Sequence, residues 1–193
     1  MKSFEEMYQV VEESGNEASF SKLECEAVYD LLNEISARDF PLNIVEIGVQ
    51  YGRSTTMFAE FALIYKDWKF VAIDNWFGDD GQIAHNHVLS QIEKHAWTVD
   101  LWSIDSLRAA DQYDHKIDVL HIDGDHEYES VLSDCEAWMG KVRVGGHALF
   151  DDYGHDSLPG VYKAVNEYIG NHSGNWAFIG RYGNKLGIYK RIK

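Results

Sequence analysis

Apolar residues change their spacing along the chain at about residue 40. Before that point they recur every three or four positions, which is typical of amphipathic helices. The first expected stripe comprises Phe4, Met7, Tyr8 and Val11, and the second comprises Leu23, Ala27, Leu31, Leu32 and Ile35. The pattern therefore predicts a helical cap over residues 1–40.

After residue 40, short apolar runs alternate with amphipathic stretches. Strands are expected at 43–49, 69–74, 98–104, 117–123 and 147–151, and helices near 53–66, 82–96, 106–112, 127–140 and 158–170. Strands that alternate with helices imply parallel strands joined by right-handed crossovers. The tail differs, because Trp176–Arg181, a YGN turn and Leu186–Arg191 have the pattern of a β-hairpin. We predict one α/β domain over 1–193, with a doubly wound, Rossmann-like sheet of seven mostly parallel strands and an antiparallel C-terminal hairpin.

The net charge of the chain limits which kinds of ligand and partner are expected. The chain has 17 Lys and Arg against 32 Asp and Glu, a formal charge of −15, which disfavours nucleic acid and favours cations. No apolar run approaches the roughly 20 residues needed to cross a bilayer, and the N-terminus does not resemble a signal peptide. Cys25 and Cys135 lack any zinc-binding spacing. The expected protein is soluble and cytoplasmic, with two free thiols and no membrane partner.

The loop after the first strand has the features of a ligand cradle. Gly48 and Gly52 allow a sharp turn and a close backbone approach, and the helix that follows offers free N–H groups. The G-x-x-x-G spacing differs from the G-x-G-x-x-G of dinucleotide binders. An ordinary tight turn is the alternative. Together with Glu46 and Ser54, the pattern E-x-G-x-x-x-G-x-S resembles the S-adenosylmethionine (SAM) motif of class I methyltransferases.

The second and third strands end in further candidates for cofactor binding. Asp74 lies 26 residues after Gly48, where an acidic side chain can accept hydrogen bonds from both ribose hydroxyls. Asn75 follows it, and Asp105 and Ser106 follow the third strand. The competing interpretation is a helix N-cap or a turn aspartate for Asp74, and a helix N-cap for Asp105.

The ends of the fourth and fifth strands carry the densest group of acidic residues. Asp123, Asp151 and Asp152 should converge, because the carboxyl ends of neighbouring parallel strands meet at one edge of a sheet. Carboxylates so close repel one another, so either some of them stay protonated or a cation sits among them, and a hard divalent ion such as Mg²⁺ fits. A base for a substrate proton is also expected nearby. Asp125 is favoured, followed by His126, with His121 and His155 as further candidates.

The segments HIDGDHEYESVLSDCEAW and VRVGGHALFDDY resemble class I methyltransferases of the macrocin O-methyltransferase type, over about residues 40–192. The resemblance implies that Asp123, Asp151 and Asp152 bind Mg²⁺ and that Asp125 is a base. It implies that Glu46, Gly48, Asp74 and Ser106 contact SAM, with Asp123 beside them. It also implies a small hydroxylated acceptor, a sugar or an aromatic compound.

The chain is short for this family and lacks room for a long N-terminal lid. The loop 75–82 is the best internal substitute, since its glycines permit hinging and Trp76 and Phe77 could cover a ligand. One of these aromatic residues is expected to pack on the sheet instead.

Three rival functions remain open from the sequence. They are a catalytically silent module that binds SAM or metal, a NAD-dependent oxidoreductase on a similar sheet, and a hydroxylase that reuses the fold with a redox metal. The apolar N-terminal helices also leave room for a homodimer.

Overall fold

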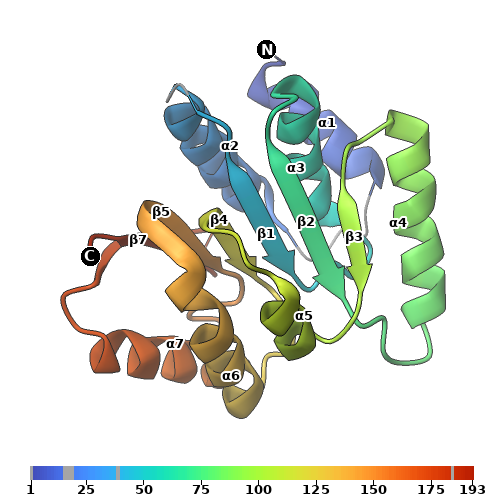
Figure 1. The fold of residues 1–193 in the computed structure, drawn as a ribbon. Coiled ribbons are helices and arrows are strands. Elements are labelled where there is room, and N and C mark those ends of the chain that lie inside the picture. Colours follow the sequence, from blue (N-terminus) through green and yellow to red (C-terminus); the bar gives the residue numbers. More distant parts are fainter. Residues whose placement is uncertain (1, 15–19, 38–39, 184) are drawn as a thin grey trace.

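Seven strands form one sheet in the order β3-β2-β1-β4-β5-β7-β6 (Figure 1). The computed structural model describes residues 2–14, 20–37, 40–183 and 185–193. Strands β1 to β5 pair in parallel, and β7 pairs antiparallel with both β5 and β6. The predicted doubly wound sheet with an antiparallel C-terminal hairpin is therefore confirmed. Asn184, the last residue of the predicted YGN turn, lies outside the described residues.

The bounds of the elements follow the expected alternation. The strands are β1 Asn43–Ile47, β2 Lys69–Asp74, β3 Asp100–Ser103, β4 Ile117–Ile122, β5 Val142–Phe150, β6 Trp176–Tyr182 and β7 Leu186–Arg191. The helices are α1 Phe4–Ser14, α2 Lys22–Ser36, α3 Arg53–Ile64, α4 Gly81–His95, α5 Ser106–Gln112, α6 Tyr128–Trp138, the 3₁₀ turn η1 Met139–Lys141 and α7 Pro159–Asn171.

Alternation along the strands divides the core between the two faces of the sheet. On β1, Ile44 packs with α1, α2, α3 and α4, whereas Val45 and Ile47 pack with α5, α6 and α7. Successive side chains of a strand point to opposite faces, so each face receives every second residue. Helices therefore cover both faces, as a parallel sheet requires.

The N-terminal helices pack onto α3 rather than forming a separate unit. Met7 and Val11 of α1 are fully buried, as their stripe predicts. The stripe expected for α2 is wrong at Leu23, which is 61% exposed. The buried apolar positions of α2 are Cys25, Val28, Leu32 and Ile35. The Ser21–Glu24 capping box fixes where α2 begins, and this start turns Leu23 outward.

Several element boundaries differ from the sequence-based expectation, including those of β1, which ends at Ile47, and α3, which ends at Ile64. Strand β5 begins at Val142, because a register shift against β4 and the positive φ of Gly145 let the strand continue through a Gly-Gly pair. Strand β3 covers only 100–103. The helix expected over 127–140 ends at Trp138 and continues as a 3₁₀ turn with Met139 buried.

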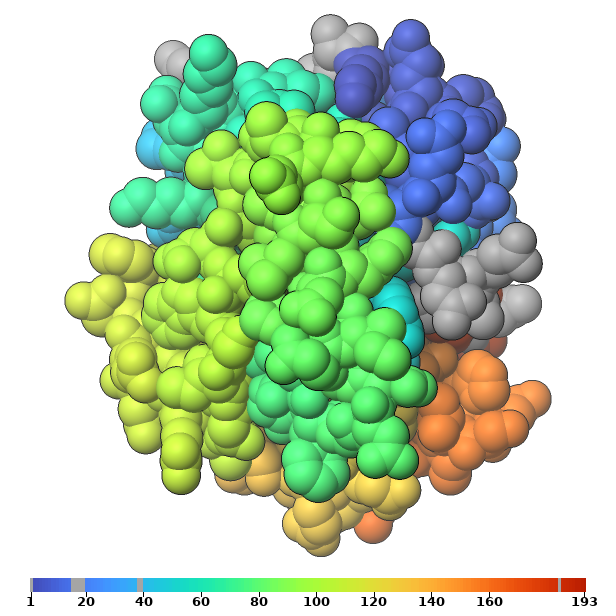
Figure 2. Space-filling model, turned by 90° about the vertical axis from the view of Figure 1, so that its right-hand side faces the viewer, coloured from blue at the N-terminus to red at the C-terminus, as the bar shows by residue number. Residues whose placement is uncertain are grey.

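The parallel strands all end at the same edge of the sheet, toward the bottom of Figure 1. Figure 2 shows the neighbouring side of the molecule, where α4 and the loop before it run down the surface and α1 lies above them. Among the described helices, none is both long enough and apolar enough to span a bilayer.

Gly48 is a tightly packed point of this edge. Its φ is +85°, and a Cβ at this position would lie 2.0 Å from the carbonyl oxygen of Asp123. No L side chain fits there without displacing the backbone of the β4 loop.

We therefore expect Gly48→Ala to lower the free energy of unfolding by about 3 kcal/mol, from backbone strain and steric overlap together. Gly78→Ala is the matched control, because Gly78 has a φ of +103° but no atom within 4 Å of the added Cβ. Its cost should be near 1 kcal/mol, from strain alone. Urea unfolding measures both, and equal losses would contradict the assigned overlap.

Candidate functional site

A cleft of about 1110 Å³ lies along the carboxyl edge of the sheet. The loops after β1, β2, β3, β4 and β5 all contribute to its lining. The sequence-predicted residues that line it are Gly48, Asp74, Asn75, Asp105, Ser106, Asp123, Asp125, His126, Asp151, Asp152 and His155. Most of the predicted site is thus brought together in one cavity, at the edge where open α/β sheets bind ligands.

Asp74 organises the cofactor side of the cleft. One of its carboxylate oxygens accepts hydrogen bonds from the backbone N–H groups of Val49 and Gln50, each at 2.9 Å. The other oxygen accepts one from the N–H of Trp76 at 2.7 Å. The carboxylate therefore joins the loop after β1 to the loop after β2. It also lines the cleft, so it combines the turn role weighed from the sequence with a place in the cavity.

Glu46, Gly52 and Ser54 lie outside the cleft lining. Glu46 is fully buried on the α3 face and accepts hydrogen bonds from the hydroxyls of Ser54 and Thr55, both at 2.6 Å. His121 Nδ1 lies 3.2 Å from the same carboxylate. Gly52 is the N-cap of α3, with a φ of +81°. In this arrangement Glu46 and Ser54 stabilise the start of α3. They could affect a cofactor in the cleft only indirectly, through the position of that helix.

Close to the residues that follow β3 lies Asp134, an acidic residue of α6 that was not among the residues predicted from the sequence. Asp105 caps α5 through the N–H groups of Leu107 and Arg108, as its N-cap interpretation has it. The hydroxyl of Ser106 donates to Asp134 at 2.5 Å, and Asp134 is 5% exposed and lines the cleft. Burial raises the pKa of Asp134 to about 6. The signal for Asp134 was its place beside Val131, Cys135 and Trp138 on the buried face of α6.

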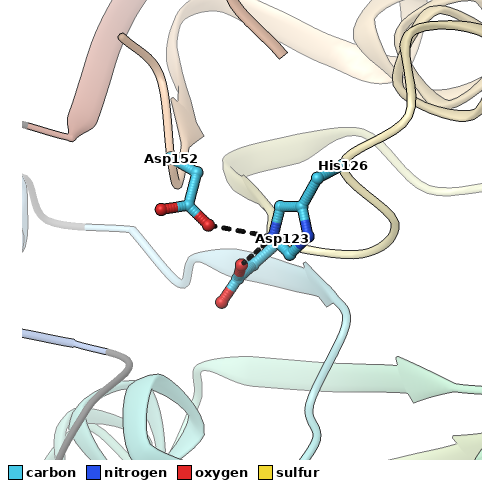
Figure 3. A group of neighbouring side chains, drawn as sticks. All are labelled: Asp123, His126 and Asp152. Atoms are coloured by element: carbon cyan, nitrogen blue, oxygen red, sulfur yellow. Dashed lines mark ion pairs between the residues drawn. The ribbon is translucent and has the colours of Figure 1, made fainter. Parts of the chain in front are cut away.

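Three side chains on the fourth- and fifth-strand loops form a group with metal-ligand geometry (Figure 3). One ligand atom each from Asp123, His126 and Asp152 lies within 4.8 Å of the others. His126 Nε2 is 2.9 Å from Asp152 and 3.9 Å from Asp123. Asp152 holds its position with a φ of +53°, an unusual conformation for a residue other than glycine.

Asp151 forms an ion pair with Lys185. Its Oδ2 accepts a hydrogen bond from the Lys185 ammonium at 2.9 Å, and the same ammonium is 3.4 Å from Asp152. The other oxygen, Oδ1, is buried and has no hydrogen-bond partner among the described residues. Lys185 lines the cleft and was not among the predicted site residues.

Repulsion and burial shift the titration of this cluster. Burial and the charge of Asp151 raise the pKa of Asp123 to about 7. Contacts with Asp123 and Asp152 raise the pKa of His126 to about 10. Burial alone would raise the pKa of Asp152, but the contacts with His126 and Lys185 outweigh burial and lower it. At neutral pH His126 is therefore an imidazolium that faces the ionised Asp152 and the partly protonated Asp123.

Asp125 stands apart from this ion-paired group. Its side chain is exposed in the cleft and accepts hydrogen bonds from the Ser130 hydroxyl at 2.7 Å and the Glu127 N–H at 3.3 Å. These contacts, the Ser130 hydroxyl first, lower the pKa of Asp125. Its carboxylate is ionised and accessible at neutral pH.

The other base candidates take different positions. His121 is fully buried beside Glu46 and does not line the cleft. His155 is exposed at the cleft. Trp76 is partly buried against the core and packs on His85 at 4.8 Å, whereas Phe77 is 93% exposed at the rim. Of the two aromatic residues, Trp76 is therefore the one that packs against the core, and it also lines the cleft.

The raised pKa of Asp134 predicts a pH-dependent effect on stability. An unfolded aspartate titrates near 4, so the folded protein binds this proton more tightly. The contribution is fully present below about pH 4 and is lost as the pH rises through about 6.

Asp134→Asn, which stays neutral, should therefore gain about 2 kcal/mol in free energy of unfolding relative to the parent between pH 4 and pH 8. Urea unfolding at the two pH values measures this gain. The exposed Asp111 on the neighbouring helix α5 supplies the control variant Asp111→Asn. A parent–variant difference that does not change with pH would contradict the assignment.

Comparison with known proteins agrees with this architecture. The O-methyltransferase NovP shares the fold with a TM-score of 0.72 and 18% identity, over 87% of this chain and 79% of that one. The Streptococcus mutans protein SMU.1697c, solved in complex with SAH, has a TM-score of 0.62 and 13% identity, over 86% and 97% of the two chains. The uncharacterized Sinorhizobium fredii protein y4gI is 31% identical over 120 residues, which is 58% of this chain but only 13% of that relative.

A family model described as "Methyltransferase domain" matches residues 45–153, more than half of the chain. The matched segment runs from the first strand through the loop after β5, and so contains the cofactor side of the cleft and the acidic group. The class I methyltransferase expected from the sequence is confirmed, and the chain belongs to this methyltransferase family.

Proposed function

We propose that this protein is a SAM-dependent, Mg²⁺-dependent O-methyltransferase that acts on a hydroxyl of a small molecule, a sugar or an aromatic compound. The observation that carries the proposal is the group of Asp123, His126 and Asp152, which lies in the same cleft as the loop around Gly48. NovP, a protein of the same fold, is an O-methyltransferase. The cleft is large enough for a cofactor and a small acceptor together.

The cofactor side fits a sulfonium nucleoside. Gly48 presents bare backbone at a point where any Cβ would collide, and Asp74 places a carboxylate at the end of β2. When bound, SAM supplies an electrophilic methyl group on a positively charged sulfur. The excess of carboxylates in the cleft attracts that charge.

The metal side fits a hard divalent cation. Asp123 and Asp152 offer oxygen atoms at ligand spacing, and Asp151 keeps one buried oxygen without a hydrogen bond. When bound, such a cation would lower the pKa of an acceptor hydroxyl and help to orient its oxygen. We assign the ligand role to Asp123, Asp151 and Asp152, with His126 as a further donor for metals that accept nitrogen.

Asp125 is the side chain best placed to take the acceptor proton. It is ionised, exposed in the cleft and held by Ser130. His126 is already in its protonated form, which Asp123 and Asp152 stabilise. The chain's own contribution is thus to orient the acceptor, hold the base and keep the reacting oxygen in line with the methyl group.

Asp74→Ala tests the cofactor side. We expect it to weaken SAH binding at least about tenfold, because it removes a ribose partner and frees the loop after β1. Isothermal titration calorimetry with SAH measures the loss. Asp105→Ala, which removes another carboxylate of the same lining, should cost less. Equal losses for the two variants would argue against a ribose role for Asp74.

Asp152→Ala tests the metal side. With labelled SAM and a panel of hydroxylated acceptors, we expect methyl transfer to be lost, while SAH still binds with an affinity close to that of the parent. EDTA should stop methyl transfer by the parent protein, and added Mg²⁺ should restore it. Full activity in EDTA would remove the metal from the proposal but leave the cofactor assignment intact.

A further inference from the structure

Lys185 lies beside the acidic group because of strand register. Residues of β5 and β7 pair so that Phe150 faces Gly187 and Leu149 faces Ile188. Extending that antiparallel register by two residues places position 185 opposite position 152. The Lys185 N–H also bonds to the Tyr182 carbonyl at 3.2 Å, which fixes the backbone just before β7. The sheet therefore directs this lysine to the acidic loop.

The ammonium of Lys185 occupies a place suited to a cation. It contacts Asp151 at 2.9 Å and Asp152 at 3.4 Å, and its side chain is only 17% exposed. A third carboxylate, that of the fully buried Glu24 on α2, interacts with it electrostatically. Its ion pairs are with the two aspartates of the loop after β5, and the charge of Glu24 acts on it from α2, outside the cleft lining.

The charges of the cluster leave little need for a further cation in this arrangement. Two cationic side chains, Lys185 and His126, face three carboxylates, those of Asp123, Asp151 and Asp152. An ammonium within 3.4 Å of two prospective metal ligands repels a divalent cation that binds the same oxygens. It also takes up one oxygen of Asp151, so that only Oδ1 remains available.

We propose that Lys185 is an internal counter-ion of the carboxylate cluster, which holds Asp151 and Asp152 together without a metal and lowers the affinity of the site for divalent cations. Lys185 is a positioning residue in this proposal, because it acts on the ligands and not on the acceptor. The inference rests on the proposed metal site. A purely structural lysine predicts the opposite effect, since loosening Asp151 would weaken cation binding.

Lys185→Gln separates charge from hydrogen bonding, because the amide still donates to Asp151 but carries no charge. We expect this variant to bind Mn²⁺ about tenfold more tightly than the parent, measured by titration calorimetry after EDTA treatment and dialysis. Lys185→Met removes both properties and serves as the second variant where the first does not fold. Circular dichroism checks the fold of each.

Lys190→Gln is the matched control. It removes one positive charge from β7, the strand that follows Lys185. Lys190 pairs with His147 and does not line the cleft, so the affinity of this variant for Mn²⁺ should match that of the parent. Equal or weaker binding by a folded Lys185 variant would overturn the inference. A parent that binds no Mn²⁺ while Lys185→Gln does would support it. If neither protein binds the ion, the inference and the metal part of the proposed function both fail.

Discussion

The structure depends on one constraint, the meeting of like charges where β4 and β5 end side by side. The parallel register pairs Ile122 with Phe150, so the next residue of each strand is an aspartate at the same edge. Asp123 and Asp151 are close enough that the charge of one raises the pKa of the other. His126 and Lys185 offset this repulsion with positive charges from two different loops.

Asp123 connects this charged group to the cofactor side. Its side chain belongs to the metal-ligand group, while its backbone carbonyl packs against Gly48. A shift of the loop after β4 would therefore move the acidic group and the cofactor loop together. Asp74 adds a second connection, since it joins the loops after β1 and β2. The two halves of the cleft are thus one rigid arrangement and not two independent sites.

The sequence predicted the sheet because its periodic signals are local, and it missed features that depend on contacts between distant segments. The position of Glu46 was readable, because strand alternation places it opposite Val45 and Ile47, on the face that α3 covers. Asp134 was also readable, since it shares the apolar face of α6 with Val131 and Cys135. The position of Lys185 was not readable. It depends on the antiparallel register between β5 and β7, and no tight turn joins these two strands to fix that register.

Part of the acidic excess behind the net charge of −15 is concentrated in the cleft. The described residues that line the cleft include the carboxylates of Asp74, Asp79, Asp80, Asp105, Asp123, Asp125, Glu129, Asp134, Asp151 and Asp152. Lys185 is the one lysine or arginine among those described lining residues, and it is already engaged by Asp151 and Asp152. An anionic ligand would find no uncommitted cation in that lining, whereas a sulfonium or a divalent ion would be attracted. The acidic composition therefore has a local consequence, because it sets the sign of the charge on the ligands that the cleft attracts.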